Sequence, residues 1–100
     1  MSLRDVLDQA AAALDGIEVA EDGSVLEWRH GGQPFAALDG NAAEFRLDPL
    51  VARAALRTPD TSPSTRGVDW VRFAPADLDA HGVDRAQAWF ASARRRLAGS

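Results

Sequence analysis

The chain has 100 residues, of which 46% are hydrophobic and 26% are charged, and it contains no cysteine. This length corresponds to one domain, and the lack of cysteine excludes disulfides and thiolate metal sites. No apolar run approaches the ~20 residues that span a bilayer, and residues 1–16 lack the uncharged apolar region of a signal peptide. We therefore expect a cytoplasmic protein with no membrane partner.

The formal net charge of −4 is unevenly distributed along the chain. Residues 1–50 carry a net charge of −7, whereas residues 51–100 carry +3, and all 11 basic residues are arginines. Phosphate contacts need a positive field, so the acidic total disfavours non-specific nucleic-acid binding. A local basic patch in the second half would override that average.

A helix over residues 3–15 is the first predicted element, because apolar side chains from Leu3 to Leu14 recur at helical spacing. Ser2 is placed to cap its free amides, and Gly16 marks its end.

From residue 17 the apolar period changes to two, which indicates strands. Four short strands are predicted, over residues 17–19, 25–29, 35–38 and 44–47. The turns between them contain glycine, which tolerates the positive φ of a tight hairpin. This pattern is typical of an antiparallel meander with one face toward water.

A second helix begins at Asp48-Pro49, with aspartate as the cap and proline at the first helical position. Thr58-Pro59 ends it. Residues 57–66 are rich in serine, threonine and proline and have no large apolar side chain, so they predict a loop.

The C-terminal part is predicted to hold a fifth strand over residues 67–73, a single helical turn over residues 75–79 and a last helix. Asp84 is the expected cap of that helix, with Gln87 at the third position as in a capping box.

Helix, four strands, helix, strand, helix is an α+β order (α-β-β-β-β-α-β-α), which predicts an antiparallel sheet of about five strands with helices packed on one face. The large aromatic side chains predict its core: Trp28, Phe35, Phe45, Trp70, Trp89 and Phe90. Phe73 alternates with Trp70, so we expect it to be partly exposed. Either strand 35–38 or strand 67–73 is a candidate for an unpaired edge.

The order of elements, the segment Gly67–Phe73 after the loop, and the closing segment Asp84–Ala93 resemble small bacterial proteins of the MmcQ/YjbR-like family. This resemblance implies a frataxin-like (CyaY-like) α+β fold and a nucleic-acid-binding role. The present chain differs from that pattern in having no lysine and an acidic balance.

No pattern in the sequence indicates catalysis. His30 and His81 are the only histidines, neither has metal-ligand spacing, and no serine lies in a nucleophile motif. We therefore expect a protein that is not an enzyme and has no cofactor and no metal.

Candidate binding residues are mostly arginines, whose forked guanidinium suits phosphate or carboxylate. They are Arg29, His30, Arg53, Arg57, Arg66 and Arg72. If the loop folds over the helix end, Arg57, Arg66 and Arg29 converge on one anion. The alternative is that these arginines form ordinary surface ion pairs, each worth at most ~1 kcal/mol.

The sequence therefore predicts a binding domain for a protein or a small anionic ligand, with a DNA-binding module of second-half arginines as the alternative. Both hypotheses require those arginines to cluster away from the carboxylates of the first half. The oligomeric state stays open.

Overall fold

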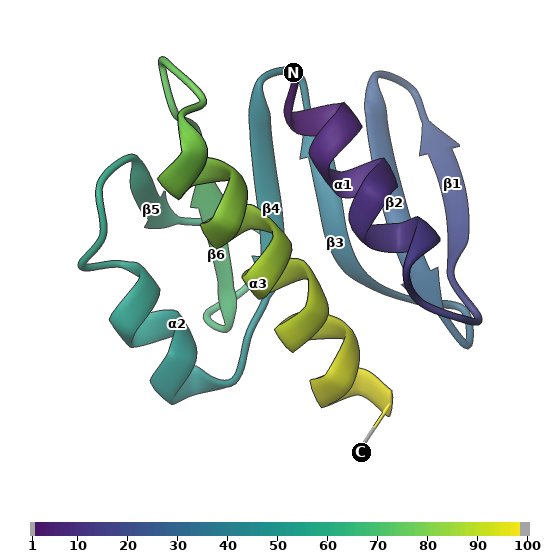
Figure 1. The fold of residues 1–100 in the computed structure, drawn as a ribbon. Coiled ribbons are helices and arrows are strands. Elements are labelled where there is room, and N and C mark those ends of the chain that lie inside the picture. Colours follow the sequence, from purple (N-terminus) through teal and green to yellow (C-terminus); the bar gives the residue numbers. More distant parts are fainter. Residues whose placement is uncertain (1, 99–100) are drawn as a thin grey trace.

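A six-stranded antiparallel sheet in the order β1-β2-β3-β4-β6-β5 forms the centre of the fold, in a computed structural model that describes residues 2–98 (Figure 1). The strands are β1 (Glu18–Asp22), β2 (Val25–His30), β3 (Gln33–Asp39), β4 (Ala42–Arg46), β5 (Thr61–Pro63) and β6 (Trp70–Phe73). The helices are α1 (Leu3–Ala12), α2 (Pro49–Ala55) and α3 (Ala80–Ala98).

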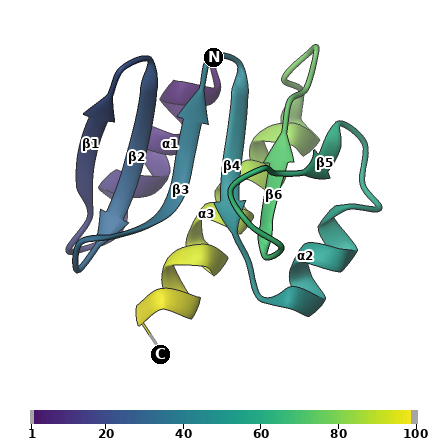
Figure 2. The same cartoon turned by 180° about the vertical axis from the view of Figure 1, so that it is seen from behind.

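Helices α1 and α3 cover one face of the sheet, while the opposite face carries no helix (Figure 2). The predicted α+β class and antiparallel sheet are confirmed, with one strand more than expected. The additional strand β5 lies within the predicted loop and pairs with β6. It was missed because its three residues include a proline and no large apolar side chain.

The core lies between the sheet and the two covering helices, with the aromatic rings of α3 at its centre. Phe90 is fully buried, and its ring centroid lies 5.9 Å from that of Trp28 and 5.1 Å from that of Phe35. One residue earlier, Trp89 meets Phe73 edge-on at 5.5 Å. Such edge contacts add to the burial of apolar area, so α3 ties β2, β3 and β6 to one another.

The two faces of β6 are the reverse of the sequence-based expectation. Phe73 is fully buried on the helix-covered face, whereas Trp70 lies on the opposite face. Side chains alternate along a strand, so Val71 joins Phe73 in the core and Arg72 lies on the side of Trp70. Trp70 is nevertheless only 8% exposed, which shows that both faces of this strand are covered.

Two of the predicted helix starts are confirmed by their caps. The Ser2 hydroxyl accepts from the Asp5 backbone N–H at 3.2 Å while the Asp5 carboxylate accepts from the Ser2 N–H at 3.1 Å. The Asp48 carboxylate accepts from the Leu50 N–H at 3.0 Å. Because these caps are local, a single sequence contains them. Helix α1 ends at Ala12, three residues earlier than expected.

The predicted start of the last helix is wrong. Helix α3 begins at Ala80, and the Asp79 carboxylate accepts from the Gly82 N–H at 2.7 Å, whereas Asp84 lies inside the helix. Gly82 reads as a helix breaker in sequence, but a Cβ at this position would lie 3.1 Å from Leu78 Cδ1. Glycine therefore permits close packing here. The helical turn predicted over residues 75–79 is an irregular connection.

Neither of the predicted edge strands is an edge. Strand β3 lies between β2 and β4, and strand β6 lies between β4 and β5. The edges of the described sheet are β1 and β5.

Truncating Phe73 tests the assignment of the faces of β6. We expect Phe73→Ala to lower the free energy of unfolding by ~3–5 kcal/mol because it opens a cavity in a full core. Val68→Ala, at a fully exposed apolar position, should change it by less than ~0.5 kcal/mol. Urea unfolding of both variants measures this difference, and a similar cost for the two would contradict the assignment.

Candidate functional site

The helix-free face carries a row of three side chains that crosses the middle of the sheet. Glu27 of β2 pairs with Ala37 of β3, and Ala37 pairs with Glu44 of β4. Ala37 is fully buried and Glu44 is 5% exposed. A buried carboxylate is costly unless a cation and hydrogen bonds compensate it, so this row needs a cation.

Arg66 supplies that cation from the connection between β5 and β6. Its Nη1 lies 2.8 Å from a carboxylate oxygen of Glu27, and its Nε lies 3.2 Å from one of Glu44. One guanidinium thus joins the two strands that flank β3, and the small side chain of Ala37 leaves room for it. We call Glu27, Glu44 and Arg66 the Arg66 clasp.

Neighbouring groups complete the Arg66 clasp. The Arg66 guanidinium lies 5.2 Å from the ring centroid of Trp70, an arrangement that favours a cation. Ser64 donates its hydroxyl to Glu44, and Arg29 donates its Nε to Glu27 at 3.1 Å. The hydrogen bonds from Arg29 and then Arg66 lower the pKa of Glu27. The connection is therefore fastened onto the sheet and covers Trp70.

The predicted convergence of arginines is met only in part. Arg29 and Arg66 do meet, but they meet at Glu27 of the same chain, so this anion is internal. Arg53 lies in α2 and Arg57 lies just beyond its end. Neither forms an ion pair with any residue in 2–98. Arg72 lies 3.9 Å from Asp39, with both side chains well exposed.

His30 has a local contact. Its Nδ1 lies 3.1 Å from the carbonyl oxygen of Gly16, in the connection between α1 and β1. Of the six predicted binding residues, three are therefore at the helix-free face, His30 is at the end of β2, and two are in or just beyond α2. They do not form one site.

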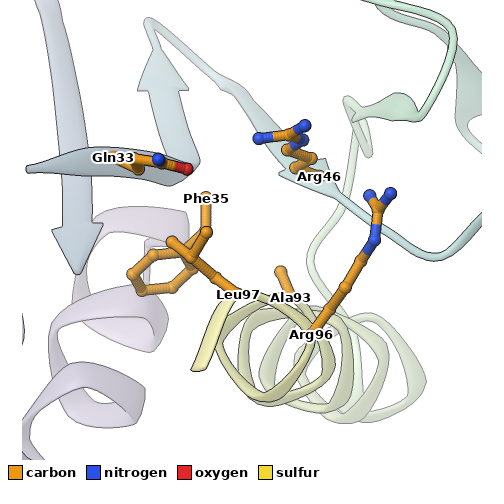
Figure 3. A pocket seen from close by; sticks show the side chains of 6 residues that line it. All are labelled: Gln33, Phe35, Arg46, Ala93, Arg96 and Leu97. Atoms are coloured by element: carbon orange, nitrogen blue, oxygen red, sulfur yellow. The ribbon is translucent and has the colours of Figure 1, made fainter. Parts of the chain in front are cut away.

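A different set of side chains lines a small pocket of about 140 Å³ between the start of β3, the end of β4 and the last turns of α3 (Figure 3). Phe35, Ala93 and Leu97 form its apolar wall, and the polar side chains of Gln33, Arg46 and Arg96 lie around the rest. The pocket therefore combines an apolar surface with two cations.

Arg46 and Arg96 are held in place by one carboxylate. Arg46 Nε lies 3.1 Å and Arg96 Nη1 lies 2.8 Å from the same oxygen of Asp69, and Arg96 Nη1 also donates to the carbonyl of Leu47 at 2.8 Å. Burial of Asp69 would raise its pKa, but the hydrogen bonds from Arg96 and Arg46 outweigh it, so the pKa is lowered. Asp69 thus stays ionised and orients both guanidinium groups.

The two arginines keep donors for a ligand. Neither Nη atom of Arg46 and neither Nη2 nor Nε of Arg96 is hydrogen-bonded to a residue of the described chain. Two cations share one carboxylate, which leaves one positive charge beside the pocket. Side-chain exposures of 40% for Arg46 and 33% for Arg96 keep these donors within reach of solvent.

Sequence reasoning missed Arg46 and Arg96 as site residues. From the sequence, Arg46 is expected to be an ordinary residue of an alternating strand, and Arg96 is expected to be a cation that stabilises the end of the last helix. Asp69 lies 23 residues from one and 27 from the other. Only the pairing of β4 with β6 and the position of α3 bring these groups together.

The described chain holds neither a cluster of metal ligands nor a membrane-spanning helix. Within residues 2–98, no three His, Asp or Glu side chains are grouped so that they could hold a metal ion, and no helix of that range has the length and apolar character to cross a membrane. Comparisons with protein-family models, curated proteins and solved structures found no match to this chain. The resemblance to the MmcQ/YjbR-like family stays a prediction.

Removing the cation of the Arg66 clasp should destabilise the fold. We expect Arg66→Ala to lower the free energy of unfolding by ~1–3 kcal/mol, because Glu44 is left buried without its charged partner. Arg72→Ala is the matched control: it removes an exposed arginine from the same face and should cost less than ~0.5 kcal/mol. Urea unfolding at neutral pH measures both free energies of unfolding. Equal effects would show that the Arg66 clasp stabilises the fold no more than an exposed arginine does.

Acid should weaken the fold through Glu27. The pKa of Glu27 lies below its ordinary value of 4.5. A carboxyl whose pKa is lower in the folded than in the unfolded chain adds stability above the unfolded value, and that stability is lost as the pH falls through the folded value. The free energy of unfolding should therefore decrease on acidification below pH 4.5, and less steeply in Glu27→Gln.

Urea titrations at a series of pH values from about 6 to about 3 give this slope. Asp77→Asn, which removes an exposed carboxylate, should retain the slope of the unmodified chain. A Glu27→Gln variant with an unchanged slope would exclude this carboxyl as a source of the acid sensitivity.

Proposed function

We propose that the protein is a non-catalytic binding domain that takes a small monocarboxylate in the pocket between β3, β4 and α3. The observation that carries this proposal is the pair Arg46 and Arg96, oriented by Asp69 with donors left over, beside an apolar wall. Arginine forks bind carboxylates through paired N–H···O contacts. Because Asp69 already orders both side chains, little conformational entropy is lost on binding.

Charge favours a carboxylate over a phosphate. The site carries one uncompensated positive charge, which a monoanion neutralises. A phosphate dianion would leave one negative charge in contact with the apolar wall and close to Asp69, which costs free energy at short range.

The volume of the pocket limits the size of the apolar part of the ligand. A volume of about 140 Å³ is close to that of a cavity that holds benzene, ~150 Å³, and is below the ~300–1,000 Å³ of pockets for drug-sized ligands. The apolar part of the ligand would lie against Phe35, Ala93 and Leu97 and the carboxylate against the arginines, with the Gln33 amide beside them.

The chemistry of the lining supports binding without catalysis. Its polar members are two arginines and one glutamine, none of which is a nucleophile or a proton carrier near neutral pH. The nucleic-acid alternative, which uses arginines of the second half, draws less support, because Arg66, Arg72 and Arg96 each lie near a carboxylate of the same chain.

Benzoate is a suitable probe because it joins a carboxylate to a ring that matches the pocket. In an amide NMR titration at pH 7 we expect saturable shifts around Gln33, Arg46 and Arg96, with a Kd of about 1 mM or lower, which corresponds to about −4.1 kcal/mol. Benzyl alcohol, the neutral analogue, should not give saturable amide shifts.

Arg46→Gln should weaken the binding of benzoate by about tenfold or more, since it removes one charge-assisted contact. Arg95→Gln, which removes an exposed arginine next to Arg96, should not. Thermal unfolding of both variants checks that they are folded. Equal shifts with benzyl alcohol, or equal weakening by the two variants, would overturn the proposal. Binding of a DNA duplex that declines steeply with salt would favour the nucleic-acid alternative instead.

A further inference from the structure

The two edges of the sheet differ in their ability to accept another strand. Strand β5 has three residues and ends in Pro63, which has no N–H to donate. Strand β1 has five residues and no proline, pairs with β2 on one side, and has no element of the described chain on its other side (Figures 1 and 2). An edge of this kind presents unpaired backbone N–H and C=O groups.

The side chains of β1 give this edge a definite charge pattern. Register with β2 places Glu18, Ala20 and Asp22 on the helix-free face, and Val19 and Glu21 on the face of Trp28. Val19 is 55% exposed. None of the three acids forms an ion pair with another residue of the described chain. The cation nearest in register, Arg29 opposite Glu18, is bound to Glu27.

This pattern opposes pairing between two copies of the protein in the register that uses the whole of β1. An antiparallel two-fold pair centred on Ala20 would place Glu18 opposite Asp22 of the second copy and Val19 opposite Glu21. Like charges directly opposite one another in a sheet are destabilising, and an apolar residue opposite a charged one gains little. A partner of opposite charge removes both problems.

We propose that β1 is the docking edge for an extended basic segment of a partner protein, which adds to the sheet as a seventh strand. Backbone hydrogen bonds supply affinity without regard to sequence, and alternate side chains supply specificity. This inference does not depend on the carboxylate pocket, which lies between other elements.

The register gives the sequence of the best partner segment. Basic residues belong opposite Glu18, Glu21 and Asp22, an apolar residue opposite Val19, and a small strand-forming residue opposite Ala20. An antiparallel segment then contains basic, basic, small, apolar, basic in chain order, and a parallel segment contains the same five residues reversed. The peptides RRTVR and RVTRR, each flanked by two threonines and blocked at both ends, carry these patterns with one composition.

The experiment titrates the isotope-labelled full chain with both peptides and follows backbone amides and their exchange with solvent. We expect at least one peptide to shift and protect amides of β1, with the fitted Kd rising about tenfold or more for the variant E18Q/E21Q/D22N. The matched control D15N/D77N/D84N removes the same number of exposed carboxylates elsewhere, so it should leave the Kd within about twofold. Replacing the central threonine of the peptide by proline should abolish binding, because proline removes an N–H and disfavours the ladder.

Three results would overturn the proposal: shifts outside β1 and its neighbour β2, equal weakening by the two triple variants, or equal binding of the proline peptide. Each would mean attraction to net charge in place of strand addition. Arg46→Gln, which should weaken carboxylate binding in the pocket, should bind the peptide unchanged, so failure of one proposal is distinguishable from failure of the other.

Discussion

The structure depends on how the helix-free face of the sheet is closed. Helices α1 and α3 are both on one face, so the β5–β6 connection has to cover the middle of the other. The Arg66 guanidinium holds it there by reaching Glu27 and Glu44 on either side of Ala37. Glu44 alone would be a costly buried charge, but with Arg66 it fixes the register of three strands and the path of the connection. A lysine, as a point charge, would not bridge the two carboxylates with the same geometry.

The ratio of cations to carboxylates separates structural arginines from those available to a ligand. Arg66 has two glutamates and therefore leaves no charge to offer. Arg46 and Arg96 have only Asp69 between them, so one positive charge remains. Arg53 and Arg57 have no carboxylate partner in the described chain, but Arg53 lies on the exposed side of a short helix and Arg57 just beyond its end, and neither lines this pocket. An uncompensated positive charge, two preorganised arginine side chains and an apolar wall occur together at the pocket.

Features that depend on nearby residues could be predicted from the sequence, and those that depend on distant ones could not. The Ser2 and Asp48 caps join residues two or three positions apart. The faces of β6 could not be assigned, because Trp70 and Phe73 are both buried, on opposite faces, and a period of two does not say which face meets the helices. The shared contact of Arg46 and Arg96 with Asp69 required the finished sheet.

The net charge of −4 does not give the local charge at either of the two surfaces for which we propose ligands. The β1 edge is acidic, and the pocket is locally basic, so the overall field attracts a basic segment to β1 and repels a carboxylate from the pocket. That field is screened over ~10 Å at 0.1 M salt, whereas a guanidinium–carboxylate contact inside a pocket is screened much less. Salt should therefore weaken the binding of a basic strand at β1, and it should reduce the long-range repulsion that a carboxylate meets before it reaches Arg46 and Arg96. The two proposed sites therefore differ in local charge, and each proposal is tested independently of the other.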